Sequence, residues 1–484
     1  MELETVIGLE IHAQLSTKSK LWCGCDNDAF GAEPNSRICP VCTGFPGMLP
    51  VLNRDALQKS VRGAAALGCE IQEFSKFDRK NYFYPDLPLG YQISQYDQPL
   101  ALRGEIKILV PAERDAHGNV GKFQQKKIRI TRVHLENDAG KNTHTKTSTL
   151  VDFNRSGAPL IEIVTEPELR SPIEARALAQ EIQKILRATK VSAADMEKGM
   201  MRFDASISLR KMGDKKLFPR SEIKNLNSFA ALENALNFEI KRQTKLWEKN
   251  EIPDCDSTRG WDDERGETLF LRKKESQDDY RYFPEPDLPP IEFSKKEIEE
   301  ISETLPELPI EKFFRYKNVF KISELDALKL SDSPELAAFF EKVVEISDDP
   351  KKSANLILSV ILSHENWQNS KITPEHAADV VQFLKNGAVS SSGGKQLLES
   401  AMESGGKIEN LIAELGLEQV SDSDEIENWI AQVLKKNPET VAQFQSGKEK
   451  VLGFLVGQVM KLSRGSANPE VLQQMLLEKL KIKN

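Results

Sequence analysis

The chain has 484 residues, with 74 acidic and 66 basic side chains, a formal net charge of -8 and 39% hydrophobic residues. This composition excludes a disordered or fibrous protein, and the length suggests about two to four domains. The most apolar late stretch, residues 451–460, is shorter than the roughly 20 residues that a bilayer span needs. The N-terminus is acidic and lacks the basic region of a signal peptide, so we expect a cytoplasmic protein.

Residues 1–293 mix strand-like alternation with three helical segments, a pattern that predicts an α+β domain built on an antiparallel sheet. The three helices are expected from Asn53 to Gly68, from Ser171 onward, and from about Ser228 to Lys249. The Pro-rich residues 284–290 can extend neither a helix nor a central strand. The first domain is therefore expected to end near residue 293.

Almost every periodic segment after this point has helical spacing, so residues 294–405 are expected to form an all-α domain. Residues 391–395 and 404–407 are rich in Gly and Ser, and we predict that both are flexible turns. Neither stretch has the spacing of a phosphate-binding loop. A domain boundary is expected near Gly406.

The remaining residues, 406–484, are predicted to form a helical tail with a basic end. Residues 441–484 contain seven Lys or Arg, at positions 448, 450, 461, 464, 479, 481 and 483, against three Glu. A solvated basic helix would explain this excess of positive charge. It equally suits a module that binds a phosphodiester partner.

Four of the six cysteines form two close pairs, Cys23 with Cys25 and Cys39 with Cys42. Two such pairs predict a structural tetrahedral Zn²⁺ site, since each pair presents two thiolates to one ion. Disulfides are the alternative explanation, which a reducing compartment disfavours. The cluster includes no histidine and leaves no open coordination position, so we assign it to loop folding rather than to catalysis.

Several strand-like runs turn isolated acidic or histidine side chains away from apolar neighbours. The residues with this pattern are Glu10 with His12, His134 with Glu136, Glu162, Asp204, and Glu222 with Lys224. A solvated sheet face would explain each strand alone. Together, these carboxylates and imidazoles suit Mg²⁺, which takes oxygen ligands and leaves positions for nucleotide phosphates.

Two segments interleave cations with tyrosines, residues 76–86 and 279–287. Such stretches clamp phosphates and stack on a base or a terminal adenosine, although an aromatic loop packed on the sheet would also contain tyrosines. The residues expected to bind phosphates or substrate are Arg79, Lys80, Tyr82, Tyr84, Lys224 and Arg281. The sequence has neither a G-x-G-x-x-G motif nor a Walker loop, so a nucleotide would lie on a sheet surface.

Long ungapped motifs run through nearly the whole chain, at residues 6–12, 32–36, 77–86, 91–95, 134–141, 152–162, 202–204, 224–228 and 279–287. With these motifs the sequence resembles the GatB/GatE family of tRNA-dependent amidotransferase subunits. The two Cys pairs also occur in part of that family. Residues 453–458, Lys461 and residues 467–469 resemble the YqeY-like tRNA-binding module of the same family.

The resemblance implies a glutamine-synthetase-like cradle domain, then a helical domain and the tail. It also implies a ligase that uses ATP and Mg²⁺ to phosphorylate the side-chain carboxylate of Glu on tRNA(Gln) or Asp on tRNA(Asn), and then amidates it. Ammonia would come from glutamine hydrolysed by a partner amidase, known as the A subunit, and the small C subunit would complete a heterotrimer. The alternative is a non-catalytic scaffold that presents charged tRNA to an amidase.

The chemistry of such a reaction assigns roles to the polar residues. A carboxylate becomes an acyl donor once its oxygen becomes a phosphate leaving group, which requires screening of like charges. The expected catalytic residues are Glu10, His12, Glu136, Glu162 and Asp204, of which the first three are expected to bind Mg²⁺. Where much of the family has Glu-Glu-Asp, this sequence has Glu136, Asn137 and Asp138. The choice of ligand between Glu136 and Asp138 therefore stays open.

Overall fold

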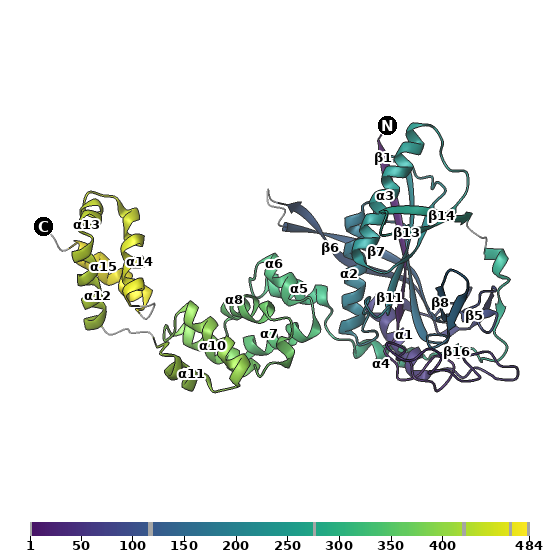
Figure 1. Cartoon of the computed structure of the whole chain (residues 1–484), viewed down its shortest axis with the longest axis horizontal. Helices are drawn as coiled ribbons and strands as arrows, with labels where there is room; N and C mark the ends of the chain where they lie inside the picture. Colours follow the sequence, from purple (N-terminus) through teal and green to yellow (C-terminus); the bar gives the residue numbers. More distant parts are fainter. Residues whose placement is uncertain (1, 115–119, 274–276, 419–422, 464–466, 482–484) are drawn as a thin grey trace. The chain divides into compact units, whose positions relative to one another are not determined.

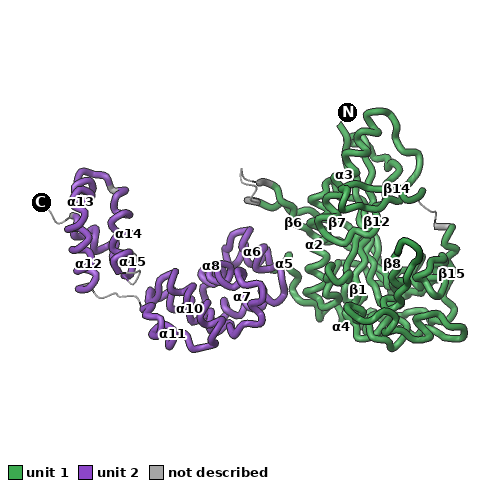
Figure 2. The backbone as a smooth tube through the Cα atoms, in the orientation of Figure 1, with its two compact units in different colours: residues 1–312 green, residues 313–484 purple. Residues whose placement is uncertain are grey.

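The computed structural model describes residues 2–114, 120–273, 277–418, 423–463 and 467–481 (Figure 1). Two compact units divide the chain, residues 1–312 and residues 313–484 (Figure 2). Among the described residues, no helix combines the length and the hydrophobicity needed to cross a bilayer. Two of the basic tail residues, Arg464 and Lys483, lie outside the described part of the chain.

A nine-stranded sheet with the order β14-β13-β12-β11-β1-β10-β7-β6-β2 dominates the first unit. Its strands are β1 (Leu3–Gln14), β2 (Glu70–Ile71), β6 (Ala101–Arg114), β7 (Val120–Asn137), β10 (Pro159–Thr165), β11 (Met201–Lys211), β12 (Ser221–Leu226), β13 (Ser257–Asp262) and β14 (Glu267–Lys273). Neighbouring strands are antiparallel except for β12 and β13, which are parallel. The antiparallel prediction is wrong for this pair, because helix α3 (Phe229–Glu248) forms the crossover that a parallel connection requires.

Three smaller sheets complete the unit. They contain β15 (Phe283–Pro284), β4 (Asp78–Asn81) and β5 (Tyr91–Ser94), then β16 (Ile291–Glu292) with β3 (Phe74–Ser75), and β8 (Lys141–His144) with β9 (Thr149–Asp152). The pairing of β15 with β4 places Phe283 opposite Arg79. The two Tyr-rich segments, about 200 residues apart in sequence, therefore lie side by side.

The predicted helices are confirmed as α1 (Arg54–Ala66), α2 (Pro172–Ala188) and α3. The side chains of Asn53, Ser171 and Ser228 accept backbone N–H groups in the first turn of each helix. Helices α2 and α3 pack against one face of the large sheet, while β5 and β8 lie on its other side (Figure 1). Apolar residues such as Ile11 and Phe203 fill the helix-covered face and leave the polar residues of the same strands on the opposite face.

Helix α4 (Lys295–Glu303) belongs to the first unit as well. It packs against α1, and the Arg62 guanidinium donates to the backbone oxygen of Thr304 at 2.8 Å and to its Oγ1 at 2.7 Å. The compact unit therefore extends past residue 293, where the sequence predicted its end, because α4 covers the outer side of α1.

The second unit is helical, as the periodicity predicts. Its helices are α5 (Pro309–Asn318), whose first residues belong to the first unit, α6 (Glu324–Leu330), α7 (Pro334–Ser347), α8 (Pro350–Val360), α9 (Pro374–Lys385), α10 (Ser391–Ser404), α11 (Ile408–Leu415), α12 (Ser423–Lys436), α13 (Pro438–Gln445), α14 (Leu452–Leu462) and α15 (Pro469–Lys481). Helix α11 packs against α9 and α10, whereas a separate apolar cluster from Ile426 to Leu480 joins α12 to α15. The domain boundary near Gly406 stays a prediction.

The turn predicted at residues 391–395 is wrong, because these residues form the first turn of α10. Ser390 caps the helix by accepting the backbone N–H of Gly393 at 3.1 Å. A Cβ atom at Gly393 or Gly394 would lie within 3 Å of Val389 or Leu384, so these glycines permit close packing rather than flexibility. The turn predicted at residues 404–407 is confirmed, with Gly405 ending α10 at a φ of 71°.

Candidate active site

The register of the large sheet aligns the polar residues singled out in the sequence. His12 on β1 lies opposite Glu162 on β10, and Glu162 lies opposite His134 on β7. On the other side of β1, Glu10 lies opposite Asp204 on β11. Directly opposite residues share a face of the sheet, so four strands from separate parts of the chain bring these side chains together.

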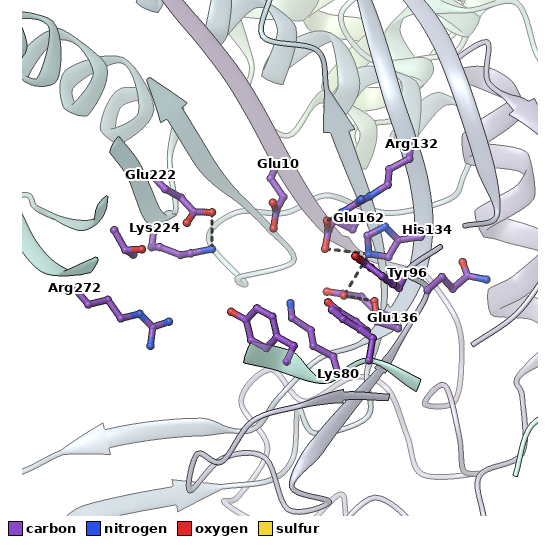
Figure 3. Close-up of a pocket in the computed structure, with 15 residues that line it drawn as sticks. Glu10, Lys80, Tyr96, Arg132, His134, Glu136, Glu162, Glu222, Lys224 and Arg272 are labelled. Carbon is purple, nitrogen blue, oxygen red and sulfur yellow. Dashed lines mark hydrogen bonds and ion pairs between the residues drawn. The ribbon is translucent and has the colours of Figure 1, made fainter. Parts of the chain in front are cut away.

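Carboxylates and imidazoles gather at this position, where Figure 3 shows Glu10, His134, Glu136 and Glu162. The side chains of His12, His134, Glu136 and Glu162 are buried, and that of Glu10 is half-buried. The two ring nitrogens of His12 lie near different carboxylates, with Nε2 at 3.2 Å from Glu10 Oε1 and Nδ1 at 3.4 Å from Glu136 Oε1. His134 Nε2 lies 3.2 Å from Glu162 Oε2 and 3.5 Å from Glu136 Oε2. His12 Nδ1 also lies 3.8 Å from Glu162 Oε2, so both imidazoles lie near Glu136 and Glu162, and His12 lies near Glu10 as well.

The cluster strongly perturbs its own ionisation. Burial disfavours the charged form of His12, but the carboxylates of Glu10 and Glu136 outweigh this effect and raise its pKa to about 10. Burial likewise opposes protonation of His134, and Glu162 and Glu136 raise the pKa of this histidine to about 9. The pKa of Glu136 falls well below its ordinary value despite burial, because both histidines face it.

Two overlapping groups in the cluster have the composition of a metal site. One contains Glu10, His12 and Asp204, and the other His12, Glu136 and Glu162, with ligand atoms that all lie within 4.8 Å of one another in each group. Oxygen-rich groups of this kind fit Mg²⁺ or Mn²⁺. His12 Nδ1 is buried and makes no hydrogen bond within the described residues, as expected of an atom that a cation would satisfy. Of the three Mg²⁺ ligands predicted from the sequence, Glu10 belongs to the first group, Glu136 to the second and His12 to both.

Cations and tyrosines face the cluster across a pocket (Figure 3). Of the residues predicted from the sequence, Glu10, Lys80, Glu136, Glu162 and Lys224 line this pocket. Lys224 Nζ lies 2.6 Å from Asp204 Oδ2, and Lys80 Nζ lies 4.9 Å from the ring centre of Tyr280. A polar pocket with both signs of charge suits a substrate that carries carboxylate or phosphate groups.

Other predicted residues lie elsewhere. Arg79 forms a two-pronged ion pair with Glu285, at 2.7 and 2.8 Å, so its guanidinium is already engaged. Tyr82, Tyr84 and Arg281 are likewise absent from the described residues that line the pocket. Their phosphate-binding and substrate-binding roles stay predictions.

Several residues that line the pocket were not among the site residues predicted from the sequence. They are Ser94, Gln95, Tyr96, Arg132, His134, Glu222, Thr258, Arg272, Tyr280 and Tyr282. Arg132 was accessible to that reasoning, since strand alternation places it on the same face as His134. Arg272 gave no comparable signal, because it lies in a strand whose neighbouring side chains are exposed.

Asn137, the departure from the family pattern, faces away from the cluster. Its Oδ1 accepts hydrogen bonds from Trp22 Nε1 and from the backbone N–H of Ile93, both at 3.0 Å. Because successive strand residues point to opposite faces, an amide here leaves the position of Glu136 in the cluster unchanged. The side-chain amide of Asn137, which belongs to β7, therefore connects the Cys-containing loop to β5 through these hydrogen bonds.

Asp138 also lies outside the cluster. It is buried, and the guanidinium of Arg202 binds both of its carboxylate oxygens at 3.1 Å, with Arg155 Nε at 3.2 Å. Both cations lower the pKa of Asp138 against the effect of burial. The acidic side chain of this motif that faces the histidines is therefore Glu136.

The four predicted zinc ligands, Cys23, Cys25, Cys39 and Cys42, converge. Their Sγ atoms lie within 4.8 Å of one another, and none of these cysteines forms a disulfide. The Sγ atoms of Cys39 and Cys42 are 3.9 Å apart. A tetrahedral site with Zn–S bonds of about 2.3 Å requires sulfurs roughly 3.8 Å apart, so this spacing fits zinc.

Lys20 gives independent support for negative charge at the cysteines. Its side chain is completely buried, and its Nζ lies 3.6 Å from Cys42 Sγ and 3.4 Å from the backbone oxygen of Phe153. Within the described parts of the chain, no carboxylate lies at ion-pair distance from this ammonium. Burying an ammonium without an anion is costly, and a thiolate at Cys42, whose pKa is lowered to about 5, would supply that anion.

A polar pocket over a carboxylate and histidine cluster, on a sheet face opposite packed helices, is the kind of site at which an enzyme acts on a charged substrate. Comparison with known proteins gives the family. Residues 5–299 match the GatB/GatE catalytic domain and residues 338–480 match the GatB domain. The chain belongs to this family of amidotransferase subunits, as its motifs predict.

Similar proteins cover the whole chain. It is 46% identical to the B subunit of the aspartyl/glutamyl-tRNA(Asn/Gln) amidotransferase of Persephonella marina, over 99% of this chain and 100% of the relative. The protein of the same name from Thermotoga sp. strain RQ2 is 45% identical over 98% of each chain. That from Caldicellulosiruptor bescii is 43% identical over 99% of each chain.

The contacts of Asn137 predict that Asn137→Leu destabilises the fold. This substitution leaves the N–H groups of Trp22 and Ile93 buried without acceptors, at a cost of roughly 1–3 kcal/mol each. Thermal unfolding of the full chain should show a lowered midpoint, whereas Asn237→Leu at an exposed helix position should not. Retention of the wild-type midpoint by Asn137→Leu would show that these hydrogen bonds contribute little.

Proposed function

We propose that this chain is the catalytic subunit of a tRNA-dependent amidotransferase. It converts the side-chain carboxylate of Glu on tRNA(Gln), of Asp on tRNA(Asn), or of both, into an amide in a reaction that consumes ATP. The observation that carries this proposal is a pocket lined by Glu10, His134, Glu136 and Glu162 together with Lys80 and Lys224. His12 lies beneath these carboxylates as part of the same cluster, and it is not among the described residues that line the pocket. Family membership supports the same reaction.

The reaction has two stages. The substrate carboxylate attacks the γ-phosphorus of ATP, ADP leaves and an acyl phosphate forms. Ammonia then attacks the carbonyl carbon, inorganic phosphate leaves and the nitrogen loses a proton. The first stage brings two anions together and needs positive charge, and the second needs a group that receives the proton that the nitrogen loses.

Residues of this chain meet those needs. Lys80 and Lys224 offset the like charges of carboxylate and phosphates, and a carboxylate of the cluster accepts the proton that the attacking nitrogen loses. His12 and His134 hold the carboxylates in place through the ion pairs described above. Mg²⁺, held by His12 with Glu10 and Asp204 or with Glu136 and Glu162, would supply positive charge to the phosphate oxygens.

We further propose the partners and the structural metal. An amidase, the A subunit of the complex, supplies ammonia from glutamine, and the small C subunit completes the heterotrimer, which works in the cytoplasm where tRNAs are charged. Zn²⁺ bound by the four cysteines stabilises the loop from Cys23 to Cys42. The tail holds tRNA through phosphate contacts, since its sequence is basic near the end.

Glu10→Gln is expected to lower amide formation by roughly 10²–10³-fold while leaving tRNA binding nearly unchanged, because it removes charge from the cluster and not from a tRNA surface. The assay supplies the complex with Glu-tRNA(Gln), Mg²⁺, ATP and free ammonium, which bypasses the amidase. His12→Ala should behave alike, and Glu4→Gln on the same strand serves as the matched control. A wild-type complex that binds charged tRNA but consumes no ATP would favour the non-catalytic scaffold instead.

Lys20→Met is expected to lower zinc affinity by roughly 10–100-fold, because it removes the buried cation that faces a thiolate. Competition with a chromophoric chelator measures this affinity, and Lys18→Met at an exposed position is the matched control. Metal analysis of the wild-type protein should first give one zinc per chain. Equal affinities for Lys20→Met and wild type would contradict this role of Lys20.

Removal of residues 419–484 is expected to weaken tRNA binding and to flatten its dependence on salt. Each lost phosphate contact should lower the slope of log Kd against log salt by about one. The deletion removes the whole α12–α15 cluster rather than cutting through it. A truncated complex with the wild-type slope would exclude the tail as a phosphate-binding module.

A further inference from the structure

Residues 279–287 run along the wall of the pocket, and we call this segment the Tyr strap. Its Tyr280 and Tyr282 line the pocket together with Lys80, which reaches into it from β4 (Figure 3). The ring centre of Tyr280 lies 4.9 Å from Lys80 Nζ, and Tyr282 stacks on Tyr96 with ring centres 4.2 Å apart. The Tyr strap therefore forms part of the surroundings of the Lys80 ammonium.

Little apolar packing holds the Tyr strap in place. The structure describes all of residues 279–287, and among them only Glu285 is buried. The ladder with β4 includes only Phe283 and Pro284, and the backbone N–H of Glu285 adds a hydrogen bond of 2.9 Å to the oxygen of Phe77. A segment with so few buried apolar groups depends on polar contacts for its position, because burial contributes little to its stability.

The ion pair between Arg79 and Glu285 is the principal polar contact. Both carboxylate oxygens accept from the guanidinium, at 2.7 and 2.8 Å, and the side chain of Glu285 is 0% exposed. Arg79 also donates to Asp287 at 3.1 Å, and its guanidinium lies 4.2 Å from the ring centre of Tyr91. A two-pronged pair fixes direction as well as distance, and loss of either partner leaves an uncompensated buried charge.

A second contact from β4 holds the turn between the two tyrosines. Arg281 has a φ of 44°, a left-handed conformation that residues other than glycine adopt only where their surroundings fix it. The side-chain amide of Asn81 donates to the backbone oxygens of Tyr280 at 3.2 Å and of Arg281 at 2.8 Å. Asn81 thus holds the strap on one side of Tyr282, and Arg79 holds it on the other.

Lys80 lies between these two residues on β4. Successive strand residues point to opposite faces, so Arg79 and Asn81 face the strap backbone while Lys80 faces the pocket. Arg79 is not among the described residues that line the pocket. A displacement of about 1 Å in a positioned group can cost roughly 10²-fold in rate, so the surroundings that fix the Lys80 ammonium affect the reaction.

We propose that Arg79 is a positioning residue, whose ion pair with Glu285 holds the Tyr strap against β4 and thereby keeps the Lys80 ammonium where the reacting anions meet. This inference rests on the proposed function, because it assigns Arg79 a role in the same reaction through Lys80. It differs from the expectation drawn from the sequence, in which Arg79 binds a phosphate directly.

The test compares variants of the complete amidotransferase complex, with ammonium as nitrogen donor. Arg79→Gln and Glu285→Gln each break the ion pair from one side, and the double variant leaves no uncompensated buried charge. Arg103→Gln is the matched control, because it breaks an exposed ion pair with Glu70. Thermal unfolding verifies that each variant is folded. If a single variant does not fold, the double variant carries the same comparison.

Each variant that breaks the Arg79 pair should lower kcat roughly tenfold or more, because the position of Lys80 is lost. The KM values for ATP and for charged tRNA should stay within about twofold of wild type, and the double variant should be no slower than the slower single variant. In a Lys80→Met background, the same substitutions should change kcat by less than about twofold, since no ammonium is left to position. Arg103→Gln should change none of these constants.

A higher KM for ATP in Arg79→Gln without one in Glu285→Gln would overturn the proposal in favour of direct phosphate binding. Wild-type kcat in the folded variants would overturn it too, as would an undiminished loss of kcat in the Lys80→Met background, which would indicate a general structural effect. Failure of the proposed function is distinguishable, because the wild-type complex would then show no ATP-dependent amidation with ammonium at all.

Discussion

The mutual neutralisation of buried acids and imidazoles is the constraint on which the catalytic unit depends. Three carboxylates cannot share a buried sheet face without countercharge, because desolvation of each anion is costly. His12 lies near all three of these carboxylates and His134 near two, and the raised pKa values of about 10 and about 9 reflect this demand for positive charge. A divalent cation would answer the same demand for positive charge.

The rest of the first unit holds the strands of the large sheet in the positions that bring these side chains together. Helices α2 and α3 bury the apolar sides of the same strands, which forces every second side chain toward the pocket. The Cys-containing loop supports the far end of β7 and the turn before β10, through Trp22 on Asn137 and through Ser156 Oγ, which donates to the backbone oxygen of Cys42 at 3.0 Å. The loop that contains the four cysteines therefore supports the strands that carry Glu136 and Glu162.

Much of this arrangement was predictable because strand alternation is a local property. Alternation placed Glu10 with His12 and His134 with Glu136 on one face, and cap residues located the first three helices. Sequence could not show that Arg79 pairs its charge with Glu285, because that ion pair depends on β4 meeting β15. Nor could it show that Gly393 and Gly394 continue a helix, since their neighbours Val389 and Leu384 require their small size only in the packed structure.

The position of His12 between two groups of acids limits how a metal ion could use this side chain. Its Nε2 faces Glu10 and its Nδ1 faces Glu136 and Glu162. A neutral imidazole offers a lone pair on one nitrogen and a hydrogen on the other, so it ligates on one side at a time. His12 could therefore serve as a ligand in only one of the two groups at a time, and its tautomer would decide in which, while a cation in the other group would be held by carboxylates alone.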